Sequence, residues 1–334
     1  MLRRVAAVTT LALALFGCAG APVTVEHPPR AEQPVPIART DRPVVAFVLG
    51  AGAARGFAHA GALKVLDDAG IRADIVVGTS AGSLVGALYA GGIRGAALVD
   101  MALAVQRAEL LEFVFPHRGF IDGERLQAFV NRALDGRRIE QLELPFVAIA
   151  TDLKTGALTA FNRGDTGLAV RASCSVPAVF QPTSIEGREY VDGSLVSPLP
   201  VRTARALGAD VVIAIDVSLH ATDQQEVGGT KAIVTQTFVV MESTIAREEK
   251  KLADVVLQPD LAGVRLSDLS ARGRAIAAGE QAARDALPEI ERLIELKTEA
   301  KATQIGGSDA SRAATSLESD HLRPVEQTRS LPDE

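Results

Sequence analysis

The sequence has few of the residues that build stacking surfaces, disulfide frameworks or basic binding faces. Its 334 residues include no tryptophan, two tyrosines and two cysteines, Cys18 and Cys174. Two cysteines exclude a disulfide framework and a metal site built from several thiolates. The 35 basic residues are outnumbered by 41 acidic ones, which gives a formal net charge of −6. A nucleic-acid partner is therefore not expected, because such a partner needs basic and aromatic surface.

Apolar residues, in contrast, are plentiful. The chain is 47% hydrophobic and 23% charged, which is ordinary for a globular protein. The length fits one large domain or two small ones, with enough apolar mass to bury a core.

The N-terminus has the pattern of a targeting segment. Arg3 and Arg4 precede an apolar run over residues 5–16, which is too short to span a membrane comfortably as a permanent helix. The run ends at Leu-Phe-Gly-Cys, which resembles a bacterial lipobox, so we expect residues 1–18 to be a lipoprotein-type signal segment with lipid attached to Cys18. The alternative is an ordinary signal peptide cleaved after Ala19 or Ala21. With Ala19 after the cysteine, the resemblance implies an outer-membrane lipoprotein that faces the periplasm.

Composition divides the remaining chain into three parts. Residues 19–42 are rich in proline, so we expect an extended, semi-rigid tether outside the core. Residues 43–301 carry the periodic apolar patterns of a folded domain. Residues 302–334 are dominated by Gly, Ser, Thr and charged residues, and this composition predicts a disordered tail.

Within the domain, short Val- and Ile-rich runs alternate with helical patterns. Strands are expected at 44–49, 75–79, 145–151, 158–161, 210–217 and 253–258, and a strand and turn at 183–191. Helices are expected at 57–68, 81–88, 93–111, 122–134, 165–174, 201–207, 231–251 and 270–301. This alternation predicts an α/β fold with a mainly parallel sheet covered by helices on both faces. The apolar connection 111–120 is either a buried loop or an acyl-binding or membrane-touching edge.

The stretch around Gly78-Thr79-Ser80-Ala81-Gly82 organises the domain. A buried strand leads into Gly-x-Ser-x-Gly, and a helix of small apolar residues follows. This arrangement is typical of a turn that holds a serine hydroxyl at the tip of a strand. The helix N-terminus behind Ser80 directs free N–H groups towards developing negative charge.

A second glycine-rich turn follows the strand 44–49. Its sequence, Gly-Ala-Gly-Ala-Ala-Arg-Gly over residues 50–56, departs from the dinucleotide-binding pattern because Arg55 occupies the place of the third glycine. Two glycine-lined turns side by side fit an oxyanion hole beside a nucleophile better than a nucleotide site.

A nucleophilic serine needs a base, and the residues alone leave two arrangements open. In the order Ser…Asp…His, Ser80 would act with Asp192 and a downstream histidine, either His220 or His321. In a two-residue site, Asp192 itself would accept the serine proton, with its pKa raised by partial desolvation. His59, in the helix 57–68, is expected to pack in the fold, and Cys174 is expected to be a buried thiol.

Several stretches together resemble the patatin-like phospholipases in kind and in order, over about 44–217. They are Gly50–Gly56, Gly78–Gly82, Ala150-Thr151-Asp152-Leu153, the run Arg171-Ala172-Ser173-Cys174-Ser175-Val176-Pro177, and Tyr190-Val191-Asp192-Gly193. The resemblance implies a three-layer α/β/α sandwich and a serine acyl hydrolase that cleaves fatty-acyl esters of phospholipids or lysophospholipids. It implies no metal or organic cofactor. The expected partners are the lipid substrate and, through the lipid anchor, a membrane.

The resemblance also implies roles for individual residues. Ser80 would be the nucleophile and Asp192 the base of a Ser–Asp dyad. The oxyanion would be held by backbone N–H groups of Gly52, Ala53, Ala54 and Ala81. Motif support is expected from Gly50, Arg55, Gly56, Gly78, Gly82 and Gly193. The alternatives are a Ser-Asp-His esterase that uses His220 and a membrane-tethered binding protein with the same fold but no turnover.

Overall fold

The computed structural model describes residues 26–33, 36–37, 42–112, 114, 118–219 and 229–320. Eight strands form one sheet: β1 (Val45–Leu49), β2 (Ile75–Thr79), β3 (Phe146–Asp152), β4 (Leu158–Phe161), β5 (Thr183–Ile185), β6 (Arg188–Asp192), β7 (Val211–Ile215) and β8 (Val255–Leu257). Every residue of β1, β2, β3 and β7 is buried. These continuous apolar runs are therefore central strands with both faces covered.

Helices connect the strands in the order that the sequence predicts. They are α2 (Phe57–Asp68), α3 (Ala81–Ala90), α4 (Gly95–Ala104), α5 (Arg107–Leu110), α6 (Glu124–Ala133), α7 (Thr166–Ser173), α8 (Val201–Ala206), α9 (Gly229–Lys250) and α10 (Arg272–Asp320). Two single turns of 3-10 helix matter for the site, η1 (Ala53–Gly56) and η3 (Gly193–Leu195).

The strand order is β5-β6-β3-β2-β1-β7-β8, and β4 also pairs with β3. The pairs that link β8, β7, β1, β2 and β3 are parallel, whereas β3 pairs antiparallel with β4 and β6, and β5 pairs antiparallel with β6. The prediction of a mainly parallel sheet is confirmed.

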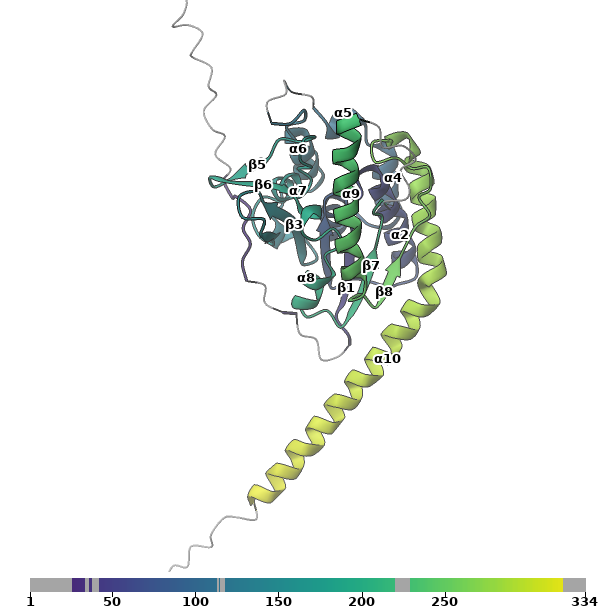
Figure 1. The fold of residues 1–334 in the computed structure, drawn as a ribbon. Coiled ribbons are helices and arrows are strands. Elements are labelled where there is room, and N and C mark those ends of the chain that lie inside the picture. Colours follow the sequence, from purple (N-terminus) through teal and green to yellow (C-terminus); the bar gives the residue numbers. More distant parts are fainter. Residues whose placement is uncertain are drawn as a thin grey trace, which may run out of the picture.

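Alternate side chains of each strand enter two separate cores, as the period of two in a strand requires. Phe47 of β1 packs into the larger core with α2, α3, α4, α6, α7 and α10. Ala46 and Val48 pack into the smaller core with α8 and with Ala246 of α9. Figure 1 shows α9 crossing the near side of the sheet and α10 passing α2 before it extends away from the domain. The fold is thus a three-layer α/β/α sandwich, as expected.

Two helices differ from their predicted bounds. The predicted helix 93–111 is split into α4 and α5, because Val105 and Gln106 have extended backbone angles and Gln106 starts a new helix through a capping box with Glu109. Helix α10 continues to Asp320 and so crosses residues 302–320, where a disordered tail was expected. Helix-favouring Ala, Glu, Lys and Arg are concentrated in residues 272–301 of α10, and nothing in the composition of 302–320, rich in Gly, Ser and Thr, explains the continuation.

The segment predicted to be a tether outside the core is attached to the domain over its described part. The N–H of Arg30 donates to the carbonyl oxygen of Arg163 at 3.0 Å, and the N–H of Asp165 donates to that of His27 at 2.8 Å. Further along, Ile37 packs against the smaller core. Over residues 26–33 and 36–37, the chain before β1 is therefore in contact with the domain.

Candidate functional site

The register of β3 brings two strand ends together. Along one edge of β3, β2 pairs in parallel and stops with Thr79 beside Ile149. On β3, β4 pairs across the overlapping residues 148–151, so it occupies the opposite edge. The antiparallel strand β6 therefore continues along the edge of β2, and its last residue, Asp192, lies beside Ala150. Strands β2 and β6 thus run head-on towards each other, and residues 80 and 192 meet at their ends.

Ser80 occupies the sharp turn that the sequence predicts between β2 and α3. Its backbone angles are φ 55° and ψ −123°, which is a strained combination for a residue with a side chain. Hydrogen bonds to the N–H and to the carbonyl oxygen of Ser80 stabilise this conformation. The N–H of Ser80 donates to the Ser173 hydroxyl at 2.9 Å, and its carbonyl oxygen accepts from the N–H and the hydroxyl of Ser83.

The two glycines of Gly-x-Ser-x-Gly are required by close approach of the backbone. A Cβ on Gly78 would lie 2.4 Å from the carbonyl oxygen of Gly82. A Cβ on Gly82 would lie 2.1 Å from the carbonyl oxygen of Leu49, at the end of β1. Any side chain at either position would push α3 away from the strands and move Ser80.

The hydroxyl of Ser80 donates a hydrogen bond to Oδ2 of Asp192 at 2.7 Å, across 112 residues of sequence. The other carboxylate oxygen, Oδ1, accepts from the N–H of Ser194 at 2.8 Å. Both side chains are shielded, since Ser80 is 6% and Asp192 is 1% exposed. The structure therefore places the predicted nucleophile and the predicted base in direct contact in a dry environment.

Burial raises the pKa of the Asp192 carboxyl from 3.8 to about 6, against the opposing hydrogen bonds from Ser194 and Ser80. Desolvation disfavours the charged form, while donors to the carboxylate favour it. A carboxylate with this pKa is ionised at neutral pH and is a stronger base than an exposed aspartate.

Three of the four amides that were expected to hold an oxyanion are free to do so. Within the described part of the chain, the N–H groups of Gly52, Ala53 and Ala81 have no hydrogen-bond acceptor. Ala53 adopts φ 48°, so alanine accepts the left-handed conformation here. The expectation for Ala54 needs correction, because its N–H donates to the carbonyl oxygen of Leu266 at 3.0 Å. That amide is already used to fix the loop.

The glycine-rich loop lies directly beside the serine turn. A Cβ on Gly56 would be 2.6 Å from the Cβ of Ala81, so only glycine allows this contact. A hydrogen bond from α2 fixes Gly50, because Nε2 of His59 donates to the Gly50 carbonyl oxygen at 2.9 Å. His59 is completely buried, and burial lowers the pKa of its imidazole to about 4. It remains neutral and packs in the fold, as predicted.

The run 171–177, which the sequence singles out without a role, ties the two strand ends together. Its Ser173 hydroxyl accepts from the N–H of Ser80 and donates to the carbonyl oxygen of Ile149 at 2.6 Å. The carbonyl oxygen of Ser175 accepts from the N–H of Asp192 at 3.0 Å. Thr151 adds a hydrogen bond from its hydroxyl to the Asp192 carbonyl oxygen. These positioning contacts had no signal of their own in the residue spacing.

One further acidic group faces this region and was not predicted. Burial, followed by the negative charges of Asp192 and Asp216, raises the pKa of Glu242 on α9 to about 8, and Arg55 opposes that rise. Arg55 itself is 5% exposed, so its charge acts inside the fold. Nearby, Glu249 of α9 accepts from the Ser197 hydroxyl at 2.9 Å, and burial raises its pKa to about 7.

The remaining predicted positions have simple outcomes. Gly193 follows Asp192 and begins η3. Cys174 is a buried free thiol, as expected, and burial raises its pKa. Cys18, His220 and His321 lie outside the described residues.

The described residues offer neither a metal site nor a membrane-spanning helix. No group of three or more His, Cys, Asp or Glu side chains there is arranged to hold a metal ion. No helix in the same ranges combines the length and hydrophobicity needed to span a membrane.

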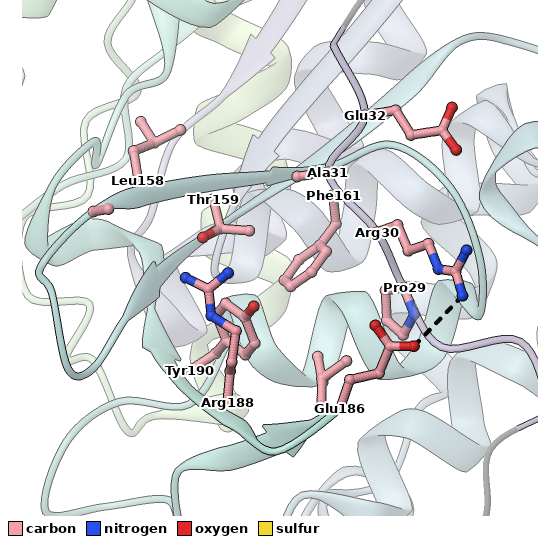
Figure 2. Close-up of a pocket in the computed structure, with 12 residues that line it drawn as sticks. Pro29, Arg30, Ala31, Glu32, Leu158, Thr159, Phe161, Glu186, Arg188 and Tyr190 are labelled. Carbon is pink, nitrogen blue, oxygen red and sulfur yellow. Dashed lines mark hydrogen bonds and ion pairs between the residues drawn. The ribbon is translucent and has the colours of Figure 1, made fainter.

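A separate pocket of about 620 Å³ lies between residues 29–32, β4 and the β5–β6 hairpin (Figure 2). Its charged groups are largely paired with each other. Arg30 lies 3.5 Å from Glu186, and Arg188 forms an ion pair with Asp152 while it covers the Tyr190 ring. Neither Ser80 nor Asp192 lines this pocket, which offers no nucleophile and base in contact.

Comparison with known proteins agrees with the site geometry. Residues 47–205 match the family model described as patatin-like phospholipase. An uncharacterized NTE family protein of Mycobacterium bovis is 34% identical over 179 residues, which are 53% of this chain and 49% of that protein. Lysophospholipase NTE1 of Coccidioides immitis is 36% identical over 185 residues, which are 52% of this chain and 11% of that protein. The chain spans at most about half the length of these curated relatives.

Among solved structures, VipD from Legionella pneumophila aligns with a TM-score of 0.52 and 11% sequence identity, over 86% of this chain and 73% of that one. This likeness concerns the fold alone. The family match covers β1 to α8, and so includes both glycine-rich turns, Ser80 and Asp192. Residues 47–205 thus form a domain of the patatin-like phospholipase family.

Proposed function

We propose that this protein is a serine acyl hydrolase that cleaves fatty-acyl esters of phospholipids or lysophospholipids. The observation that carries the proposal is the 2.7 Å hydrogen bond from the Ser80 hydroxyl to the Asp192 carboxylate, in a site from which water is largely excluded. The substrate class is supported by the family match and by the name of the Coccidioides immitis relative, a lysophospholipase.

In the proposed first step, Oγ of Ser80 attacks the ester carbonyl carbon while its proton moves to Oδ2 of Asp192. The N–H groups of Gly52, Ala53 and Ala81 stabilise the oxyanion, each by roughly 3 kcal/mol. The intermediate then collapses, the C–O bond to the alcohol breaks, and the alcohol takes the proton from Asp192. The fatty acyl group remains on Ser80 as an ester.

In the second step, water attacks the acyl carbonyl and gives a proton to Asp192. The Ser80 oxygen leaves and recovers this proton, and the fatty acid is released. The same carboxylate thus serves as base and acid in both half-reactions.

Direct contact between Ser80 and Asp192 favours this dyad over a triad with His220. In a Ser-His-Asp triad the imidazole lies between the hydroxyl and the carboxylate. A Ser80–Asp192 separation of 2.7 Å leaves no room for an intervening ring.

Hydrolysis of p-nitrophenyl butyrate by purified variants tests the proposal. We expect Ser80→Ala and Asp192→Asn each to lower kcat/KM by at least about 1000-fold with an unchanged circular dichroism spectrum, since each removes a member of a cooperative unit. His220→Ala is expected to retain activity. If Asp192→Asn stays active while His220→Ala is dead, the dyad is wrong. If the folded wild type has no activity on any acyl ester, the non-catalytic binding protein is the better account.

The N-terminal expectations remain part of the proposal. We propose that Cys18 carries lipid and anchors the protein in the outer membrane, facing the periplasm. Membrane fractionation of wild type against Cys18→Ser would show the variant released if this is correct, and equally membrane-bound if it is not.

A further inference from the structure

Exposed apolar side chains flank the Ser80–Asp192 pair on two separate elements. On α9 they are Ile233, Val234, Val240 and Met241, and on the loops before α6 and after α7 they are Phe120 and Val179. All six are between 42% and 55% exposed. We call these six side chains the apolar rim.

The rim residues of α9 form one stripe that faces away from the domain. Their spacing of one, seven and eight residues places them on the same side of a helix. The opposite side carries Val239 and Ala246, which are 3% and 1% exposed. Over its first three turns, α9 therefore carries apolar side chains on its outer side as well as on the side that packs against the domain.

This first part of α9 extends beyond the edge of the sheet where the dyad lies. The C-terminal end of α9 is fixed at that edge, because Lys250 forms an ion pair with Asp216, the residue after β7, and Glu249 binds Ser197. Two turns earlier, Glu242 is close enough to Asp192 for that charge to raise its pKa. With a rise of 1.5 Å per residue, residues 229–241 extend roughly 20 Å further.

The two remaining rim residues lie on loops that are connected to Asp192 through backbone hydrogen bonds. Phe120 and Val179 are linked by a hydrogen bond from the Phe120 N–H to the Val179 carbonyl oxygen at 2.9 Å. The loop that carries Val179 begins after Ser175, which accepts the N–H of Asp192. Exposed apolar side chains therefore lie both on α9 and on the loops linked to Asp192.

Few charged residues lie on these segments. Residues 229–241 contain one charged residue, Lys231, and residues 174–183 contain none, whereas six of the ten residues 242–251 are charged. Beside Phe120, Arg118 is paired with Glu189 and Asp122 with Arg171. Clustered exposed apolar side chains of this kind mark an interaction site. The scarcity of basic residues argues against a partner that is recognised by negative charge, such as an anionic membrane surface.

We propose that the apolar rim docks on a lipid bilayer of neutral headgroups and so places the dyad at the membrane surface. The choice of partner rests on the proposed function, because the proposed substrate is an ester that lies in a bilayer. Ser80 is only 6% exposed, so this substrate has to be brought close to the site. Exposed apolar side chains spread over separate segments also fit a deformable lipid surface better than a groove-filling protein segment.

Co-sedimentation with phosphatidylcholine vesicles tests this proposal. Every protein is the full chain with Cys18→Ser, so that no attached lipid contributes to binding. We expect Ile233→Ser with Val234→Ser to lower the partition coefficient roughly tenfold, because two half-exposed side chains lose their burial in lipid. Hydrolysis of p-nitrophenyl butyrate, a substrate free in solution, should be unchanged. Binding of the unsubstituted rim should depend little on salt.

The matched control is Leu252→Ser with Leu296→Ser. These residues are 41% and 52% exposed, similar to Val234 and Ile233, but Leu252 follows α9 and Leu296 lies far along α10. This control is expected to bind vesicles as the parent does. Equal binding by the rim variant and the control would overturn the proposal, as would binding that requires anionic lipid. A dimer that the rim variant converts to monomer, with no vesicle binding, would instead assign the rim to a second copy. Loss of ester hydrolysis in the parent would refute the proposed function, not the rim.

Discussion

At the scale of single residues, the chemistry depends on how Asp192 is held. Removal from water raises its pKa, and the donors from Ser80 and Ser194 limit the rise, so the balance is a pKa of about 6. Ser194 contributes through both its backbone N–H and its side chain. The carboxylate thereby gains base strength close to that of an imidazole while it stays ionised at neutral pH.

The pH dependence of hydrolysis follows from this balance. In the proposed mechanism Asp192 is the base and must be ionised, so we expect kcat/KM of wild type to rise with pH and to reach half its plateau near pH 6. Ser194→Ala removes a donor to the charged form, so its midpoint should move to higher pH. A pH profile on p-nitrophenyl butyrate measures both. A wild-type midpoint near pH 4, or a Ser194→Ala midpoint shifted downwards, would contradict the assigned environment of Asp192.

At the scale of secondary-structure elements, the site is a meeting of strand ends. The ends of β1 and β2 carry the two glycine-rich turns, and β6 approaches β2 from the opposite direction along β3. Helix α2 supports the first of these turns from within the larger core, through the hydrogen bond from His59 to Gly50. Because His59 is buried and neutral, this support is sensitive to acid.

We expect His59 to make the fold less stable as pH falls from 6.5 towards 4. Its pKa is lowered from 6.5 to about 4 by burial, so the unfolded chain binds the proton first, and the stabilising contribution present above pH 6.5 is lost on acidification. The contribution is about 3 kcal/mol at most. Thermal unfolding of wild type and His59→Gln across this range checks it. The variant's melting temperature should depend less steeply on pH, and parallel curves would show that His59 is not the group concerned.

The local elements were predictable, and their long-range contacts were not. Strand, turn and helix around Ser80 follow from a few adjacent residues, and the glycines follow from the sharpness of the turn. The contact of Ser80 with Asp192 depends on the register of β3 with three partners, which no spacing in the chain reveals. The resemblance to a family supplied that pairing. It also included Ala54, whose amide proved to be bound to Leu266, from a loop outside the matched region.

At the scale of the whole molecule, composition was a poorer guide than periodicity. The proline-rich segment before β1 was expected to lie free, but Arg30 and His27 bond to the chain at residues 163 and 165. Composition cannot reveal that the chain between β4 and α7 offers unpaired backbone groups to this segment. The polar residues after 301 likewise belong to α10 as far as Asp320.

Docking of the proline-rich segment bears on how the molecule would sit on a membrane. If Cys18 carries lipid as proposed, seven residues separate it from Glu26, the first described residue. The eight Cα-to-Cα steps between them span at most about 30 Å. The edge of the sheet near β4 would then stay within that distance of the bilayer, which is compatible with contact between the apolar rim and lipid.

The most direct test of the central claim, that Ser80 is an activated nucleophile, is covalent labelling with a fluorophosphonate followed by peptide mass spectrometry. We expect one adduct per chain, on the peptide that contains Ser80, and its formation should be lost in Ser80→Ala and strongly slowed in Asp192→Asn. An adduct on another residue, or a folded wild-type protein that remains unlabelled, would contradict the proposed hydrolase.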